Sequence, residues 1–227
     1  MLIELDRAQA HYLLDVMRLK VGDQLRLFNG QDGEWLTSIA DVARRSCQLR
    51  VDKQLRPQKE DPGPTLLFAP IKKARMEMLV EKATELGVGS LIPVRTKRSI
   101  VDRVNTERLR TIAIEAAEQC ERLTIPDIHE LKTLEQVLNA WPADLPLYAA
   151  DETGGAQPLL QALRPEPERP AAFLIGPEGG FDPIELERLG KHPAVMKVDL
   201  GPRVLRAETA GMVVLAGWVT LFEGRKI

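Results

Sequence analysis

Two glycine-containing segments in the second half of the chain combine residue types that can do chemistry. They are FLIGPEGGFDP at residues 173–183 and VDLGPRVLRAETA at residues 198–210, and each begins as an apolar, strand-like run. Glycines at the carboxyl end of a strand leave backbone amides and carbonyls open to a ligand. The two segments therefore predict loops that face one ligand pocket. The alternative is that each is only a tight connection between a strand and a helix, with Asp182 and Pro183 starting the helix after the first segment.

Charged residues in the second segment have two possible roles. Arg203 and Arg206 lie among apolar residues, where a fixed guanidinium would serve a phosphate, a carboxylate or a developing anion. Glu208 and Thr209 could instead cap the last helix of the chain.

Several familiar kinds of site are not indicated by the sequence. No GxGxxG segment opens a helix after a first strand, and there is no GxxxxGK[ST] phosphate loop. Cys47 and Cys120 stand apart, and with the three histidines they make no zinc-binding spacing. We therefore expect neither a standard dinucleotide or ATP site nor a metal site.

The composition is that of an ordinary globular protein. The chain has 227 residues, of which 44% are hydrophobic and 28% are charged, so it can bury a core. The longest strongly apolar stretch, Met212–Phe222, is about half of the ~20 residues that a membrane-spanning helix needs. Charged residues also interrupt the N-terminal segment, where a signal peptide would be apolar. We expect a cytoplasmic protein with no membrane association.

A proline-rich segment divides the chain. Pro57, Pro62 and Pro64 rule out a continuous helix and favour an extended connector. Residues 1–62 are then expected to form a small domain and residues 63–227 a larger one. The small domain should contain a helix and three strands, at Ala8–Arg18, Gln24–Asn29, Glu34–Val42 and Cys47–Asp52. Turn signals between the strands predict a barrel-like or meander unit.

The large domain alternates short apolar runs with segments of helical periodicity, which predicts an α/β fold with a largely parallel sheet. Strands are expected at Leu66–Ala69, Leu91–Val94, Leu147–Ala150, Ala172–Ile175 and Val195–Leu200. Helices are expected at Met76–Leu86, Arg108–Cys120, Ile184–Leu189 and Thr209–Phe222.

Charge is unevenly distributed, although the net charge is only −2. Residues 71–110 carry ten basic and five acidic side chains, whereas residues 111–200 carry seven basic and sixteen acidic ones. Because screening limits electrostatic attraction to roughly 8 Å at physiological ionic strength, the local potential of the basic segment decides whether phosphates bind there. The segment fits a nucleic-acid contact and also a solvated helix face.

Taken together, these segments resemble a known family. Besides the two glycine loops, the chain contains HYLLDVMRLKVGD at residues 11–23, APIKK at 69–73, EKATELG at 81–87 and EAAEQCER at 115–122. From end to end it resembles the bacterial methyltransferases of the SPOUT class that modify N3 of a uridine in small-subunit (16S) ribosomal RNA. The resemblance implies a PUA-like β-barrel that binds RNA, a trefoil-knotted α/β methyltransferase domain, the cofactor S-adenosylmethionine (SAM) and a homodimer.

The resemblance also implies which residues form the site. The cofactor pocket would use Leu174, Ile175, Gly176, Glu178, Gly179 and Gly180 on one loop, and Leu200, Gly201, Val204, Leu205 and Ala210 on the other. RNA would be contacted by Arg18, Lys72, Lys73, Arg98 and Arg122. The target uridine must be unstacked to expose N3.

Methyl transfer to uracil N3 has its own chemical requirement. Because N3 is largely protonated and poorly nucleophilic at neutral pH, the site must provide a base, stabilise the uracil anion, or do both. We expect Arg206 to orient the uracil or stabilise its anion, and Glu178 or Glu115 to accept the proton.

Three other functions are compatible with the sequence. They are methylation of transfer RNA or of another base by a related enzyme, RNA binding without catalysis, and turnover of a small phosphorylated metabolite by an α/β enzyme. Intact glycines in both loops favour an active methyltransferase over a protein that only binds RNA.

Overall fold

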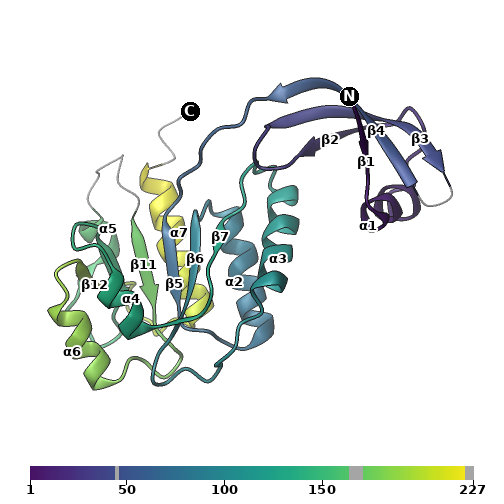
Figure 1. The fold of residues 1–227 in the computed structure, drawn as a ribbon. Helices are drawn as coiled ribbons and strands as arrows, with labels where there is room; N and C mark the ends of the chain where they lie inside the picture. The colour runs from purple at the N-terminus through teal and green to yellow at the C-terminus, as the bar shows by residue number, and fades with distance from the viewer. Residues whose placement is uncertain (44–45, 164–170, 223–227) are drawn as a thin grey trace. The chain divides into compact units, whose positions relative to one another are not determined.

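The computed structural model describes residues 1–43, 46–163 and 171–222. The chain divides into two compact units, Met1–Glu60 and Asp61–Ile227 (Figure 1). No helix among the described residues combines the length and apolar character that crossing a membrane requires.

The N-terminal unit is built on an antiparallel sheet with the strand order β1-β4-β3-β2. Its strands are β1 (Leu2–Glu4), β2 (Gln24–Phe28), β3 (Glu34–Ala43) and β4 (Ser46–Arg56). The three predicted strands are present, and β1 adds a further strand by pairing with β4. A small core joins the sheet to the helical segment through Leu5, Ala10, Leu13, Ile39, Cys47 and Leu49.

The helix predicted at Ala8–Arg18 is only partly correct. An α-helix, α1, covers Arg7–His11, and a π-helical turn, η1, continues it over Tyr12–Val16. In that turn the Met17 amide donates to the Tyr12 carbonyl at 2.9 Å, a hydrogen bond that spans five residues instead of four. Arg18 follows in the left-handed region, at φ 58°. Apolar spacing over so short a segment does not distinguish a π-turn from an α-turn.

The C-terminal unit contains a parallel sheet. Within the described residues its strand order is β10-β12-β9-β11-β5-β6-β7, and β8 pairs with β6 beside this path. The strands are β5 (Thr65–Phe68), β6 (Ser90–Arg95), β7 (Asp127–Ile128), β8 (Lys132–Thr133), β9 (Leu147–Ala150), β10 (Gln157–Pro158), β11 (Ala172–Ile175) and β12 (Val195–Asp199). The helices are α2 (Lys73–Glu85), α3 (Thr106–Gln119), α4 (Leu134–Ala140), α5 (Leu159–Ala162), α6 (Pro183–Lys191) and α7 (Ala207–Phe222).

Helices cover both faces of this sheet (Figure 1). Side chains alternate along a strand, so Leu66 and Phe68 of β5 pack with α2, α3, α5 and α7, whereas Leu67 packs with α4 and α6. Burial on both faces is typical of parallel sheets. The predicted α/β class with a parallel sheet is confirmed, and the trefoil knot stays a prediction.

The strands and helices predicted for the C-terminal unit are present with small shifts at their ends. The apolar stripe of α3 is buried from Leu109 to Ala117, but Cys120 lies beyond the end of that helix and is exposed. Trp218 of α7 is buried and its ring contacts those of Phe173 and Phe222. The short elements β7, β8, β10, α4 and α5 were not predicted.

Candidate functional site

Three adjacent strands end at one cavity. β12, β9 and β11 are neighbours in the sheet, and the loops that follow them line a cavity of about 330 Å³. This volume lies within the range of small-molecule sites. The carboxyl edge of a parallel sheet is where α/β proteins bind ligands, because loop backbone groups and helix N-termini meet there.

The loop after β11 both lines the cavity and starts a helix. Asp182 caps α6, and its Oδ1 accepts a hydrogen bond from the Ile184 amide at 3.0 Å. That hydrogen bond, together with the nearby Lys97, lowers the pKa of the Asp182 carboxyl below its ordinary value. The helix start expected at Asp182 and Pro183 is confirmed, and the same loop contributes Gly176, Glu178 and Gly180 to the cavity.

Gly180 allows two loops to approach each other closely. It adopts φ 68°, a conformation that residues with a Cβ rarely take. A Cβ at this position would lie 2.6 Å from Oε1 of Glu152, which belongs to the loop after β9. The Glu152 carboxylate can therefore lie against the backbone of the glycine loop only because residue 180 has no side chain.

The loop after β12 supplies further apolar lining. The Gly201 amide donates to Oδ1 of Asp199 at 2.9 Å, which turns the chain away from the strand. Five apolar residues from this loop and the start of α7 line the cavity, namely Leu200, Val204, Leu205, Ala207 and Ala210. Val204 is 81% exposed, so a ligand that covered it would bury apolar surface.

A third loop, after β9, lines the same cavity with Asp151, Glu152 and Thr153, which the sequence analysis did not predict. The Asp151 side chain is only 7% exposed, and its carboxylate accepts from the Thr153 hydroxyl and lies 3.1 Å from Lys197 Nζ. Burial raises the pKa of Asp151, but the Thr153 hydrogen bonds and Lys197 outweigh this effect and lower it. The sequence does contain a signal for this loop, because Gly154 and Gly155 follow an apolar strand.

Most of the predicted cofactor residues lie at this cavity, namely Ile175, Gly176, Glu178, Gly180, Leu200, Gly201, Val204, Leu205 and Ala210. Two predicted residues do not line it. Leu174 is fully buried in the core between the sheet and helices α4 and α6. Gly179 accepts a hydrogen bond at its carbonyl from Arg98 Nη1 at 2.8 Å.

The three residues predicted to act in catalysis have different surroundings. Glu178 lines the cavity and pairs with Arg75. Arg206 is exposed directly before α7 and does not line the cavity, whereas Arg203 does. Glu115 is exposed on α3 and does not line the cavity either. Glu115 as a proton acceptor stays a prediction, because its place on that helix lies outside the cavity lining.

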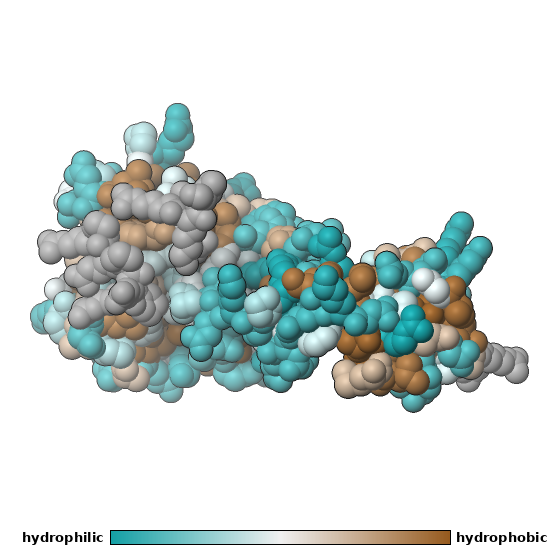
Figure 2. Space-filling model, turned by 90° about the horizontal axis from the view of Figure 1, so that it is seen from above, coloured by the Kyte–Doolittle hydropathy of each residue, from teal (hydrophilic) through white to brown (hydrophobic). Residues whose placement is uncertain are grey.

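Basic side chains lie at the same edge of the sheet. Lys72 and Lys73 are exposed where β5 leads into α2, and Arg98 follows β6 and also lines the cavity. In the N-terminal unit Arg18 is exposed. On the face of that smaller unit seen in Figure 2, hydrophobic residues lie among hydrophilic ones, and Tyr12, Val16 and Met17 are among its exposed apolar side chains.

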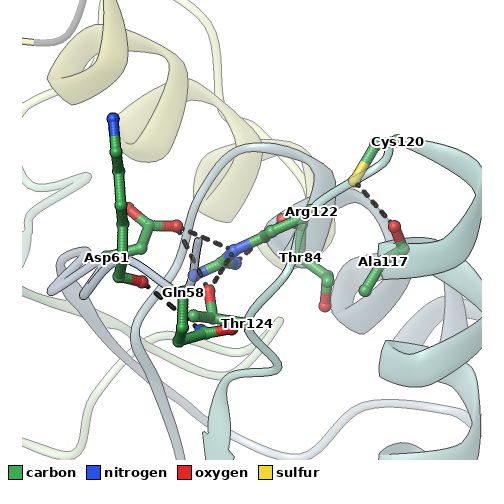
Figure 3. A network of polar contacts seen from close by, with 8 residues as sticks. Gln58, Asp61, Thr84, Ala117, Cys120, Arg122 and Thr124 are labelled. Atoms are coloured by element: carbon green, nitrogen blue, oxygen red, sulfur yellow. Dashed lines mark hydrogen bonds and ion pairs between the residues drawn. The ribbon is translucent and has the colours of Figure 1, made fainter. Parts of the chain in front are cut away.

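Arg122 does not lie on an open surface as expected for an RNA contact. Its side chain is only 9% exposed, and Nε donates to Asp61 Oδ2 at 2.9 Å. Further hydrogen bonds join it to the Thr84 carbonyl and to Thr124 Oγ1 (Figure 3). The guanidinium thus ties the end of α2 to the residues after α3 and to Asp61 at the start of the unit, which is a structural role.

The fold and the cavity define the class of the protein, an α/β protein that can hold a small ligand at the carboxyl ends of adjacent parallel strands. Residues 59–219 match the family model of the RNA methyltransferase domain, and residues 5–52 match that of the RNA methyltransferase PUA domain. The chain belongs to this family of RNA methyltransferases. The predicted enzyme class and the PUA domain are thereby confirmed.

Individual relatives support the same assignment. The chain is 37% identical to Ribosomal RNA small subunit methyltransferase E of Rickettsia conorii, with 91% of this chain and 84% of that protein covered. It is 34% identical to the protein of the same name from Synechocystis sp., with coverage of 97% and 74%. A solved methyltransferase structure from Legionella pneumophila, in complex with its bound cofactor SAM, superimposes with a TM-score of 0.86 at 31% identity, covering 98% of this chain and 93% of that one.

Proposed function

We propose that this protein transfers a methyl group from SAM to N3 of a uridine in small-subunit (16S) ribosomal RNA. The observation that carries the proposal is the cavity between the two glycine loops, in a chain of the RNA methyltransferase family. Its relatives in Rickettsia conorii and Synechocystis sp. are named as methyltransferases of small-subunit ribosomal RNA. The uridine N3 target comes from the motifs that the chain shares with the resembled family.

The chemistry of the cavity fits SAM. Apolar side chains such as Ile175, Leu200 and Leu205 can cover the adenine and exclude water, while glycine backbone groups are free to bind its polar edge. Glu152 and Glu178 place carboxylates at the cavity, and carboxylates favour the positive charges that SAM carries on its sulfonium and amino groups. In this proposal Leu174 and Gly179 support the loop from outside the cavity.

The residues beside the cavity divide the chemical work. When bound, SAM would supply a methyl group on a sulfonium, a good leaving group that would depart as a neutral thioether. Glu178 accepts the proton that N3 loses, and Arg206 stabilises the negative charge that develops on the uracil. Arg206 is exposed, so it is free to meet an RNA base that enters from solvent. Alignment of N3 with the methyl carbon contributes the rest of the rate enhancement.

Exposed basic residues would bind the RNA backbone. Lys72, Lys73 and Arg98 surround the carboxyl edge of the sheet, and Arg18 offers a further contact on the PUA domain. The uridine has to be extruded from its stack before N3 can enter the cavity. We place the enzyme in the cytoplasm as a homodimer, as the resemblance implies, and sedimentation equilibrium would test the dimer.

The deciding experiment is methyl transfer from labelled SAM to small ribosomal subunits that lack the modification, followed by nucleoside mass spectrometry of the RNA. We expect labelled 3-methyluridine. As a control, Arg188→Ala should keep wild-type activity, because Arg188 is exposed on α6 and pairs with Glu135 outside the cavity.

Other results would identify the alternatives. Label in transfer RNA or in another nucleoside would keep the enzyme class and reject the substrate. RNA binding without any binding of SAM would favour a protein that only binds RNA. Affinity for phosphorylated metabolites in place of SAM would favour the third alternative.

A further inference from the structure

Arg75 contacts two carboxylates that come from distant parts of the chain. In α2, its Nη1 donates to Oε1 of Glu178 in the loop after β11. Its Nε lies 3.6 Å from Oε1 of Glu208 in the first turn of α7. One guanidinium thus joins three segments, and one of its partners lines the cavity.

Glu208 is an unusual partner because it is almost completely buried. Its side chain is 5% exposed, and among the described residues its Oε2 has no hydrogen-bond partner. Burying a carboxylate is costly unless both oxygens are paired, so such an exception calls for an explanation. The positive end of the α7 dipole offsets part of this cost, but it supplies no hydrogen bond to Oε2.

The pairing between Arg75 and Glu208 is incomplete. Its Nε to Oε1 distance of 3.6 Å exceeds that of a hydrogen bond. An arginine can bind one carboxylate through two parallel N–H donors. Arg75 does not bind Glu208 in this way while it contacts Glu178. The Oε2 atom of Glu208 therefore remains open to a hydrogen bond from the guanidinium.

We infer that Arg75 is a positioning residue for Glu178, and that Glu208 is the alternative partner that lets Arg75 release it. While paired, Arg75 holds the Glu178 carboxylate at the cavity. When a uracil enters, the guanidinium turns to Glu208 and fills its open oxygen, and Glu178 is free to accept the N3 proton. This inference rests on the proposed function, because it needs a substrate that gives up a proton.

The other charged groups at the cavity have different places. Arg98 donates to the Gly179 carbonyl at 2.8 Å, and Lys97 pairs with Asp182 at 3.2 Å. No contact joins Arg203 or Glu152 to Glu178 among the described residues. Loss of Arg75 is therefore the change that should release Glu178 before the substrate binds.

A double-mutant cycle on kcat tests the inference with Arg75→Ala, Glu178→Gln and the double variant. Each single change should lower kcat by roughly 10²-fold, within the range for general acid–base catalysis. The double variant should be no slower than Glu178→Gln alone, because Arg75 acts through Glu178. The KM for SAM should change little in Arg75→Ala, because Arg75 does not line the cavity. If Arg75 had only a structural role, the losses of kcat in Arg75→Ala and Glu178→Gln would multiply in the double variant. That result would overturn the inference.

Two further variants cover the case in which Arg75→Ala folds poorly. Arg75→Lys keeps a cation near both carboxylates and should restore part of the lost kcat. Glu208→Gln should keep SAM affinity and melting temperature but lower kcat, because the neutral amide no longer attracts the guanidinium. Unchanged kcat in Glu208→Gln would contradict the release step.

The same assay distinguishes failure of the proposed function from failure of the proposed role of Arg75. Absence of 3-methyluridine with the wild-type enzyme would contradict the proposed function. Wild-type activity with multiplying effects of Arg75→Ala and Glu178→Gln would contradict only the role of Arg75.

Discussion

At the scale of single residues, Arg206 and Arg203 compete for the role of the cation that faces the uracil. Arg203 lines the cavity, whereas Arg206 is exposed beside it, and neither has a side-chain partner within the described part of the chain. An arginine that lines the cavity would contact a cofactor bound there, whereas one outside the cavity is open to contact with RNA. The two should therefore differ in which step they affect.

We predict that Arg206→Ala abolishes turnover while SAM affinity stays within a few-fold of wild type. Loss of a donor that stabilises a developing anion costs roughly 10²–10³-fold in kcat. Single-turnover methyl transfer and calorimetric SAM titration measure the two effects. Arg203→Ala is the matched comparison and should weaken SAM binding more than Arg206→Ala does. Normal turnover in Arg206→Ala would remove this residue from the reaction.

We also predict that Gly180→Ala weakens SAM binding by about tenfold or more, which corresponds to roughly 1.4 kcal/mol. The alanine must adopt φ 68°, which residues with a Cβ rarely take, and its Cβ meets Glu152 Oε1 at 2.6 Å, so the loop backbone is strained and the Glu152 side chain has to shift at the cavity. Gly190→Ala is the control, because Gly190 lies in α6 and a Cβ there meets nothing within 4 Å. Equal SAM affinity in both variants would contradict the role of the close approach.

The sequence predicts the parts of the site that carry local motifs. It does not predict the parts that depend on the order of the strands in the sheet. The loops after β11 and β12 carry glycine motifs and were predicted. The acidic loop at Asp151 follows β9, which lies between those two strands, and no local pattern records that order. Arg75 was missed for the same reason, since its partners Glu178 and Glu208 are distant in sequence.

At the scale of elements, the Arg122 contacts hold together segments that lie far apart in sequence. Asp61 precedes β5, Thr84 lies near the end of α2, and Arg122 follows α3. Because Arg122 is 9% exposed, its hydrogen bonds are poorly replaced by water. The resemblance predicts an RNA contact at Arg122. The burial of its side chain indicates instead that Arg122 mainly stabilises the fold.

We predict that Arg122→Ala lowers the free energy of unfolding by about 1–3 kcal/mol, because the Thr84 carbonyl and the Asp61 carboxylate lose a buried donor. Affinity of the folded protein for RNA should stay close to wild type. Urea denaturation and a filter-binding assay measure the two quantities. The comparison is Lys72→Ala, an exposed charge that should show the reverse pattern. Weaker RNA binding in Arg122→Ala without a loss of stability would instead support an RNA contact at Arg122.

Elements with strong periodicity were predicted and short ones were not. Strands β5 and β11 are short apolar runs, and α2 and α3 show apolar residues at helical spacing. By contrast, β7, β8 and β10 each have two residues, too few for any period to appear. They exist because neighbouring strands offer hydrogen bonds to them, which is a property of the assembled sheet.

At the scale of the whole molecule, local charge matters more than the net value of −2. The basic segment 71–110 contains Lys72 and Lys73 at the start of α2 and Arg98 after β6, and the sheet brings these together at the edge that holds the cavity. The acidic excess lies in residues 111–200. A strongly negative phosphate backbone would be attracted to the basic side chains at this edge.

This arrangement predicts how RNA binding depends on salt. Lys72→Ala combined with Lys73→Ala should weaken RNA binding at low salt and reduce the slope of log K against log salt by roughly 0.7–0.9 for each phosphate contact that is lost. SAM affinity should not change, because neither lysine lines the cavity. Arg188→Ala removes an exposed charge from α6 and should leave the slope as it is. If the lysine and arginine variants gave the same slope, net charge alone would explain the binding, and the basic edge would not be the RNA surface.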